Sequence, residues 1–578
     1  MIAGGMETEG EAGLWASATG RMSDFQPLLP AESEIVSHLR SGNFDRLGDG
    51  SRPALPDPAR IVRAAFLRFL MLGGERDCRP HEKGVRISGA WITDILDLEA
   101  CRVFRDIGLN NCHFEEPPIL RAAIINRLFL NGSSFAGLQA ERLEARGGVY
   151  LRGALISDEV NISQSRLGGN LECDDARISA RHGLGLNAAG LEVRSVLARS
   201  AHIEGGIDLS GAQLAADFDC AGATVSCTGE LATDAVQVQV GGSVILRGAH
   251  FEGEVRLVAS QIAADLDCTD ALLVNPGLNA LEMSRTVVGG AFFLRGKARV
   301  DGVLAMTGAS VGTIHDQASC WPKAGELLLN RCLYGAFIDS PVDAESRLDW
   351  LARQTPQRWG EDFWPQPYEQ LATVFREMGH IEDSRSVLLV KERRQRRARR
   401  ARARNPVWRT VFAVQDTVLA ATVGYGRQPL LALVWLLFFW ALGVAVFANA
   451  ERLGALKPNN AVVLRSPEWT LCGLDISEQR SLVSSQEPAS GLARKGQNQL
   501  ECFLDRWEAS SYPEFNPWMY SLDVLLPVLE MGQKAFWRPN PSKTGGQVAI
   551  SYFYFQSVVG WALSLLAVAG FSGLVKSK

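Results

Sequence analysis

The sequence predicts a mainly β protein in which a parallel β-helix is followed by a helical hairpin and two transmembrane helices. Three observations point to this fold class. Apolar residues recur every 11 positions through the first half of the chain, glycine is frequent at 56 of 578 residues, and two long apolar segments lie near the C-terminus. A chain of this length exceeds what one compact core can hold, so several domains are expected.

The 11-residue repeat is plainest at the apolar centre of each unit. The spacing relates Ile87, Leu98, Leu109 and Leu120, and it recurs further along the chain. Apolar residues two positions apart suit a strand with one buried face, and the glycine density disfavours a regular helix. Short strands that stack in parallel, with two units per coil, form a solenoid with interior ladders of side chains. Residues 85–315 would then make roughly ten coils, about 50 Å long at ~4.8 Å per rung.

A longer period of 47 and 48 residues separates Cys173, Cys220 and Cys268. These cysteines take interior positions that leucine or isoleucine holds in other units, so we interpret them as small apolar fillers. A stacked metal or redox wire is the alternative, but histidine partners at regular spacing are missing. Nine of the eleven cysteines lie between Cys78 and Cys332 without a CxxC pair, which is typical of free thiols in a reducing compartment.

The repeat loosely resembles that of the pentapeptide-repeat right-handed β-helices, as "VYLRGALISDEVNIS" and "VILRGAHFEGEVRLV" show by eye. The resemblance implies a right-handed solenoid over residues 85–342. The open strand edges at its two ends need covers. Residues 51–84 are expected to be a helical cap, because Asp57 and Pro58 suit the N-cap and the first position of a helix. Residues 1–50 show no signal peptide and are expected to be a disordered tail.

Residues 343–405 form a predicted helical connector. Leu371, Val374 and Phe375 give one helical stripe, Gly379 breaks it, and a second helix follows, as in a hairpin of the tetratricopeptide kind. The connector ends in a basic run before an apolar segment, which is typical of a positive-inside signal and of contact with anionic lipid headgroups. Nucleic-acid binding is not expected, because no aromatic residues are interleaved with the arginines. The predicted lipid contacts are Lys391, Arg393, Arg394, Arg396, Arg397, Arg399, Arg400, Arg402 and Arg404.

Two segments are long and apolar enough to span a bilayer, residues 429–450 and residues 548–578. Basic residues precede the first span and follow the second, and both of these flanks are therefore expected in the cytoplasm. The β-helix and the C-terminus are then cytoplasmic, and residues 451–547 form an external loop. Residues 406–428 are expected to be an interfacial helix followed by a turn.

The external loop holds Cys472 and Cys502, which can pair in an oxidising periplasm and stabilise the loop by ~3–4 kcal/mol. Two free thiols are the alternative. The loop also contains an apolar helical face bounded by Trp518 and Trp537, which is too short and too polar to span. An interfacial or re-entrant helix is expected there, with the tryptophans at headgroup level. The face consists of Leu522, Leu525, Leu526 and Leu529.

Residues 422–426 spell TVGYG, the filter loop of potassium channels. A filter needs this motif between two spans, after a pore helix and on the external side. Here the motif lies before the first span, on the side of the arginines, and Arg427 replaces the acidic residue that commonly follows. We interpret Gly424 and Gly426 as the end of a helix and a turn into the bilayer.

The layout resembles an uncharacterised family of bacterial membrane proteins that join a pentapeptide-like cytoplasmic β-helix to a two-span module. The resemblance spans most of the chain and rests on "GVRISGAWITDILDLEAC", "PYEQLATVFREMG", "TVGYGRQPLLAL" and "YSLDVLLPVLEMGQ". It implies a location in the bacterial inner membrane. Members often carry the label "membrane-associated oxidoreductase". The chain shows no GxGxxG at a strand-to-helix turn, no redox CxxC, no haem motif and no nucleophile–base–acid set, so no cofactor, metal or catalytic residue is predicted.

Three functions follow as hypotheses. The first is a membrane-anchored scaffold or binding module whose cytoplasmic β-helix binds a protein partner, since long solenoid surfaces usually bind extended partners. The second is an oligomeric channel or sensor gated by the β-helix, which requires a homo-oligomer because two helices cannot enclose a pore. Gly560 and Gly570 on the second span would allow the close helix contacts of such an oligomer. A membrane-associated oxidoreductase is the third.

Overall fold

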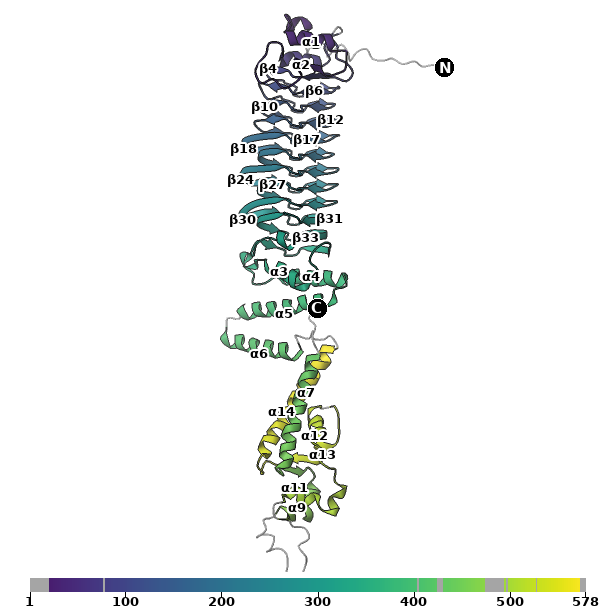
Figure 1. The fold of residues 1–578 in the computed structure, drawn as a ribbon, viewed down its shortest axis with the longest axis vertical. Helices are drawn as coiled ribbons and strands as arrows, with labels where there is room; N and C mark the ends of the chain where they lie inside the picture. Colours follow the sequence, from purple (N-terminus) through teal and green to yellow (C-terminus); the bar gives the residue numbers. More distant parts are fainter. Residues whose placement is uncertain are drawn as a thin grey trace, which may run out of the picture. The chain divides into compact units, whose positions relative to one another are not determined.

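The computed structural model of the chain separates into two compact units, Met1–Lys391 and Glu392–Lys578. The first unit contains a parallel β-solenoid of about 11 turns, which confirms the predicted solenoid, and the second unit contains the long apolar helices (Figure 1). The described residues are 20–75, 78–402, 405–423, 430–473, 493–494, 497–526 and 528–571.

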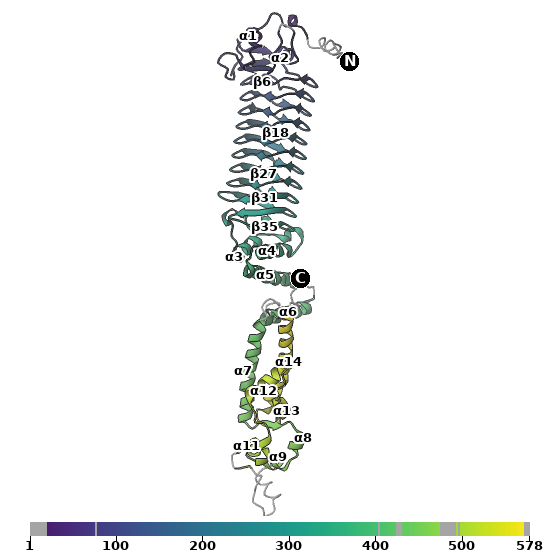
Figure 2. The same cartoon turned by 90° about the vertical axis from the view of Figure 1, so that its right-hand side faces the viewer.

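A coil of the solenoid places two short strands in one sheet and then two in the other. We call the larger sheet A and the smaller sheet B. The coil that starts at Glu144 contains β12 (Glu144–Ala145) and β13 (Val149–Tyr150) in sheet A, and β14 (Leu155–Ile156) and β15 (Val160–Asn161) in sheet B. Val149 lies opposite Leu171, 22 residues further along the chain, in parallel register. Two 11-residue units therefore make one coil, and the coils stack as layers (Figure 2).

The first strands of successive coils form one continuous face of sheet A. Each of its first-strand positions lies in register with the same position of the next coil. The strands concerned are β8 (Ile124–Ile125), β16 (Arg166–Leu167), β19 (Glu192–Val193), β22 (Gln213–Leu214), β25 (Gln239–Val240), β28 (Gln261–Ile262) and β31 (Val287–Leu294).

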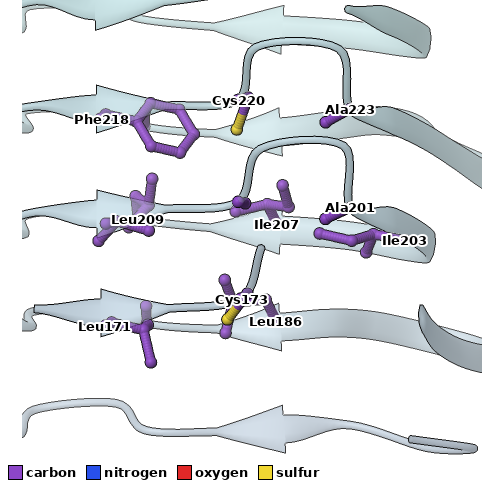
Figure 3. Close-up of a cluster of buried hydrophobic side chains, with 14 of the residues drawn as sticks. Leu171, Cys173, Leu186, Ala201, Ile203, Ile207, Leu209, Phe218, Cys220 and Ala223 are labelled. Atoms are coloured by element: carbon purple, nitrogen blue, oxygen red, sulfur yellow. The ribbon is translucent and has the colours of Figure 1, made fainter. Parts of the chain in front are cut away.

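The interior of the solenoid is a column of apolar side chains (Figure 3). Cys173, Cys220 and Cys268 are fully buried, in the interior positions that the repeat predicts. Burial raises the pKa of the Cys173 thiol to about 12, so this side chain stays protonated at neutral pH. The cysteines therefore pack as small apolar groups between bulkier neighbours such as Leu171 and Phe218.

The longer period of 47 and 48 residues arises from two alternating kinds of coil. In sheet B, strands of 11 residues alternate with strands of 7, and the longer ones project along one edge (Figure 1). The pairing shifts register where a long strand carries its extra residues, as between Ser179 and Leu184. The alternating strands are β18 (Arg177–Asn187), β21 (His202–Asp208), β24 (Thr224–Asp234), β27 (His250–Arg256), β30 (Leu272–Glu282) and β32 (Arg299–Ala305).

The predicted disordered tail is wrong for much of its described part. α1 (Pro30–His38) and β1 (Asp45–Arg46) fold onto the first coil, where β1 pairs in parallel with β3 (Val85–Ser88). Ile35 and Leu47 are fully buried in the same core as the coils. The apolar residues in this segment are too few to show a periodicity, which is why its sequence looks like a tail.

The predicted cap helix begins later than expected. Asp57 and Pro58 lie in a turn, and β2 (Ile61–Arg63) pairs with β4 (Trp91–Thr93) of the first coil before α2 (Ala64–Met71) begins. Sheet pairing and burial of β-branched side chains outweigh the local helix-start signal here.

A buried ion pair joins the two parts of this N-terminal cap. The carboxylate of Glu32 is fully buried and accepts hydrogen bonds from the backbone N of Leu29 at 3.0 Å and from Nε of Arg63 at 2.9 Å. The contact with Glu32 raises the pKa of the Arg63 guanidinium. Because the pair links α1 to the start of α2, it holds both elements over the open end of the first coil.

Helices cover the other end of the solenoid. α3 (Ala344–Ala352) and α4 (Gln366–Glu377) pack against β35 (Leu333–Phe337), and the predicted stripe of Leu371, Val374 and Phe375 is buried there. A turn at Gly379, with a φ of 88°, leads into α5 (Ile381–Arg402). The sequence predicts the last two helices but misses α3.

The second unit contains two helices that are long and apolar enough to cross a membrane, Leu430–Arg452 and Gly546–Ala569. They belong to α7 (Leu430–Arg452) and α14 (Gly546–Phe571), which pack side by side (Figures 1 and 2). α6 (Pro406–Val423) precedes α7. The positions of α7 and α14 agree with the two predicted spans.

The described residues of the predicted external loop form a folded module. Its core is aromatic, with Trp537 and Tyr520 fully buried beside Phe447 of α7. Trp537 therefore does not lie at a headgroup surface as predicted, whereas Trp518 is exposed. The elements of the module are β36 (Leu456–Pro458), α8 (Ala461–Leu464), α9 (Pro467–Cys472), α11 (Gln499–Leu504), α12 (Pro517–Leu525), α13 (Gln533–Phe536) and β37 (Trp537–Pro539).

Candidate functional surfaces

A shallow groove with a volume of about 1490 Å³ runs along sheet A across successive coils. One rim is a column of outward-facing side chains that lie in register from coil to coil. From the N-terminal end, this rim consists of Ile124, Glu144, Arg166, Glu192, Gln213, Gln239, Gln261 and Val287.

The floor of the groove is built from glycine and alanine, among them Gly168, Ala215, Gly241, Ala263 and Gly289. No bulky side chain rises from these positions, so a ligand can approach the solenoid backbone closely. Each of these residues lies two positions beyond the rim residue of its coil, and in the coils of Glu144 and Glu192 the same position is held by Arg146 and Arg194. A side chain at Gly168, Gly241 or Gly289 would meet a backbone carbonyl of the preceding coil, so the close stacking at these glycines also creates the hollow.

In every second coil, an aspartate forms a hydrogen bond to the backbone of the next coil. Asp217 accepts a hydrogen bond at 2.8 Å from the backbone N of Ser243 in the next coil, and Asp265 accepts one at 2.7 Å from Ala291. In each case the carboxylate fills the space that a side chain at Gly242 or Gly290 would need. The sequence signal is an alternation of Ala-Ala-Asp with Gly-Gly from one coil to the next, which is separate from the 11-residue apolar repeat.

The N-terminal end of the groove is rich in arginine. Arg166 pairs with Glu192 at 3.1 Å, and both side chains are largely exposed. Arg146 and Arg194 are exposed and form no ion pair with any described residue. Arg127 lies across Gly147 in the adjoining coil and is likewise exposed. This end of the groove therefore presents guanidinium groups that are available to a ligand.

The middle of the groove carries no charge on its rim. Gln213, Gln239 and Gln261 occupy three successive coils in register and are exposed. Each amide can donate and accept hydrogen bonds. At ~4.8 Å per rung, the three amides form a ladder along the axis of the solenoid.

A second surface is the exposed apolar face of α6. Val407, Val411, Val414 and Val418 follow helical spacing and are between 46% and 64% exposed. The opposite face carries Asp416, which is buried. This arrangement confirms a helix in the predicted interfacial segment and gives it an apolar side that no described residue covers.

The basic run on α5 divides into groups with different contacts. Arg396 and Arg400 pair with Asp416 of α6 at 3.1 and 3.3 Å, and the guanidinium of Arg399 lies 4.2 Å from the ring centroid of Phe412. Lys391 is buried and pairs with Glu369 at 2.8 Å, so its ammonium group does not face outward as a lipid contact would. The remaining arginines on α5 are Arg393, Arg394, Arg397 and Arg402, and Arg404 lies outside the described residues.

The short helix α12 packs against both long apolar helices. Its close approach depends on two glycines, because a side chain at Gly443 would meet Ser521 and one at Gly560 would meet the carbonyl of Leu525. Gln556 is fully buried and donates to the hydroxyl of Ser521 at 2.9 Å, and that hydroxyl donates to the carbonyl of Trp440 at 2.9 Å. α12 is thus tied to both helices by hydrogen bonds.

Cys472 and Cys502 form a disulfide that joins α9 to α11, with Cα atoms 5.7 Å apart. α12 ends at Leu525, so the predicted apolar face is shorter than expected, and Leu529 is exposed. The proline at position 527 explains the end of the helix, since a residue before proline is disfavoured in the α conformation.

The potassium-filter motif is only partly described. Thr422 and Val423 belong to the last turn of α6, and the Thr422 hydroxyl donates to the carbonyl of Val418 at 2.7 Å. Gly424, Tyr425 and Gly426 lie outside the described residues. A filter needs its backbone carbonyls to point into the pore toward the ion, whereas a helix directs its carbonyls along its own axis.

No group of three or more histidine, cysteine, aspartate or glutamate side chains in the described part of the chain has an arrangement that could hold a metal ion. The chain matches no protein-family model and no curated protein sequence.

Proposed function

We propose that the protein is a membrane-anchored binding module, whose solenoid binds an extended partner in the sheet A groove at the cytoplasmic face of the bacterial inner membrane. The single observation that carries this proposal is the groove itself. It continues over successive coils and combines a floor of glycine and alanine with a rim of glutamines and a basic N-terminal end. Concave surfaces of this kind on solenoids suit extended partners.

The anchoring part of the proposal rests on the second unit. α7 and α14 are long and apolar enough to cross a membrane. The apolar face of α6 suits the interface between headgroups and acyl chains, and the arginines of α5 suit anionic headgroups. Basic residues before α7 favour a cytoplasmic solenoid, and the Cys472–Cys502 disulfide favours an oxidising compartment for the module between the helices.

The finer fold belongs to the same proposal. Strands begin at 144, 149, 155 and 160 in one coil, a spacing of five and six residues that supports a pentapeptide-like coil, and a right-handed turn of that coil is part of the proposal. α4 and α5, which are joined through Gly379, fit a helical hairpin of the tetratricopeptide kind. Membership of the bacterial family that joins such a β-helix to a two-span module is part of this proposal.

Groove-filling variants test the binding function. Ala215 and Ala263 lie exposed on the groove floor, so A215W and A263W would obstruct the groove without overpacking the interior. His202 is exposed on sheet B, and H202W is the matched control. In-cell cross-linking should recover a partner protein with the wild-type chain and with H202W. The double variant A215W/A263W should not recover that partner. Identical recovery from all three would contradict the proposal.

A channel is the second candidate, and α12 is the observation that favours it. This helix of nine residues packs closely against α7 and α14, because Gly443 and Gly560 have no side chains there. A short helix packed in this way fits a re-entrant helix. A pore would require a homo-oligomer, since two helices cannot enclose one. Ion flux in liposomes together with a cross-linked ring would support this function. A monomer without conductance would exclude it.

A further inference from the structure

The solenoid backbone cannot recruit a partner strand inside the groove. Its amides are used between coils: the backbone N of Gly168 donates to Ala145 at 2.9 Å, and the N of Gly241 donates to Leu214 at 2.8 Å. Recognition in the groove must therefore use side chains. A partner that lies along the groove would cross the strands instead of extending the sheet.

The charges of the groove favour an acidic partner at one end only. The N-terminal end of the groove holds four arginines and two carboxylates. The arginines are Arg127, Arg146, Arg166 and Arg194, and the carboxylates belong to Glu144 and Glu192. Because Arg166 is already paired with Glu192, the arginines without an ion pair outnumber the free carboxylate. Guanidinium groups bind carboxylates with two parallel hydrogen bonds, so this end is suited to Asp or Glu side chains.

The middle of the groove is suited to a peptide backbone. Gln213, Gln239 and Gln261 offer donors and acceptors in register, which match the N–H and C=O groups of an extended chain. The floor of Ala215 and Gly241 leaves room for that chain to lie close. The carboxylates of Asp217 and Asp265 each accept a backbone N–H from the next coil, so one oxygen of each is engaged in the stacking of the coils.

The lining of the groove contains no aromatic side chain. Single-stranded nucleic acids are bound by stacking of bases on aromatic rings as well as by basic residues. An extended peptide needs no stacking platform, and it can use both the arginines and the glutamines. Peptide recognition therefore fits the whole groove, whereas nucleic-acid recognition would use only its basic end.

We propose that the sheet A groove binds an extended segment of a partner protein, with acidic side chains on Arg146 and Arg194 and the peptide backbone along the glutamine ladder. This inference rests on the proposed binding function and specifies the chemistry of the partner. The acidic residues lie at one end of the bound segment, because the basic residues lie at one end of the groove.

Fluorescence anisotropy of the full-length chain in nanodiscs of zwitterionic lipid tests the inference. The probe is a labelled twelve-residue peptide with four glutamates at one end and serines elsewhere. The same peptide with glutamines is the neutral comparison, and a labelled oligothymidine is the nucleic-acid comparison. The acidic peptide should bind more tightly than the neutral one, and its affinity should fall with added salt.

The variant R146Q/R194Q should weaken binding of the acidic peptide about tenfold. R177Q removes an exposed arginine of sheet B and should leave the affinity unchanged. Q239A should weaken both peptides by the same factor, since it removes a backbone contact. Equal binding of the acidic and neutral peptides would overturn the inference, as would tighter binding of oligothymidine that depends on Arg146 and Arg194.

The two proposals fail in different ways. If the acidic peptide does not bind but A215W/A263W still abolishes cross-linking of a native partner, the binding function stands and the acidic chemistry is wrong. If the peptide does not bind and the groove-filled variant also keeps every cross-link, both proposals are wrong.

Discussion

Arg347 and Asp316 form a two-pronged ion pair with no exposure of the guanidinium to solvent, at the point where α3 meets the last coils of the solenoid. Their nitrogen–oxygen distances are 2.8 and 2.6 Å. The indole N–H of Trp321 donates to the same carboxylate at 2.7 Å, and the Arg347 guanidinium lies 3.6 Å from the ring centroid of Phe337. Every charged oxygen therefore has a partner, which a buried ion pair requires.

Breaking this pair should open the C-terminal cap. Arg347→Met leaves the Asp316 carboxylate buried with fewer donors, and the expected loss is about 3–5 kcal/mol in the free energy of local opening. Hydrogen exchange of residues 333–352 measures that energy. Arg385→Met removes an exposed pair with Glu382 and should change it by less than about 1 kcal/mol.

The double variant Arg347→Met/Asp316→Leu supplies the second control. It removes both charges, so it should be more stable than Arg347→Met alone. If the double variant loses the sum of both single losses, the pair acts through packing alone and the electrostatic explanation is wrong.

The solenoid could be predicted from the sequence because one coil contains two nearly identical units. An interior position such as Leu151 recurs every 11 residues, and stacking requires that repeat to hold. The two caps are different, because the sequence of each cap occurs once and does not repeat. Nothing periodic marks α1, and the Arg63–Glu32 contact joins residues 31 positions apart, so local patterns cannot reveal it.

The groove could have been predicted in part. The alternation of Ala-Ala-Asp at 215–217 with Gly-Gly at 241–242 is visible in the sequence. The location of these residues depends on which strand they follow. After a different strand of the coil, the same residues would lie elsewhere on the solenoid and would not form the groove floor. The arginines at 146 and 194 were missed for the same reason: their spacing of 48 residues becomes proximity only when two coils are counted.

Gly560→Ala should displace α12. The added methyl group would point directly at the carbonyl of Leu525, which is backbone and cannot rotate away. Overpacking of this kind costs about 1–3 kcal/mol. Hydrogen exchange of residues 517–526 should become faster, whereas Ala562→Val, on an exposed face of α14, should leave it unchanged. Equal exchange in both variants would show that α12 does not depend on this close approach.

Removing the disulfide should loosen the module between the long helices. Cys472 and Cys502 are 30 residues apart, and closing a loop of this size stabilises the folded module by about 3.6 kcal/mol in the chain-entropy account. Cys472→Ala/Cys502→Ala should therefore speed hydrogen exchange of α9 and α11. Exchange within the solenoid is the internal control, because it should not change. If α9 and α11 exchange as in wild type, the bridge contributes no stability.

Asp416→Asn should release α6 from α5. The carboxylate neutralises Arg396 and Arg400, which are only partly buried, so the expected loss is about 1–2 kcal/mol after allowance for solvent screening. In nanodiscs of zwitterionic lipid, hydrogen exchange of α6 should become faster. Anionic lipid should restore slow exchange, because lipid phosphates can then pair with the two arginines. Gln415→Ala, at an exposed neighbouring position, should have no effect in either lipid.

The stability of the N-terminal cap should depend on pH through Asp45. Burial raises the pKa of this carboxyl from 3.8 to about 6, His38 opposes the shift, and Glu34 adds to it. Between about pH 4 and pH 6 the folded cap binds more protons than the unfolded chain, so its stability falls as the pH rises. Above pH 6 the full penalty is present, and below pH 4 it vanishes.

Asp45→Asn removes this penalty and should stabilise the cap at pH 7 by about 1 kcal/mol, once the shift is discounted for partial exposure. Hydrogen exchange of α1 and β1, compared with wild type at the same pH, measures the gain. At pH 4 the two proteins should exchange alike. Glu34→Gln should reduce the gain at pH 7, because it removes one of the causes of the shift. A gain of equal size at both pH values would show that the charge of Asp45 is not its source.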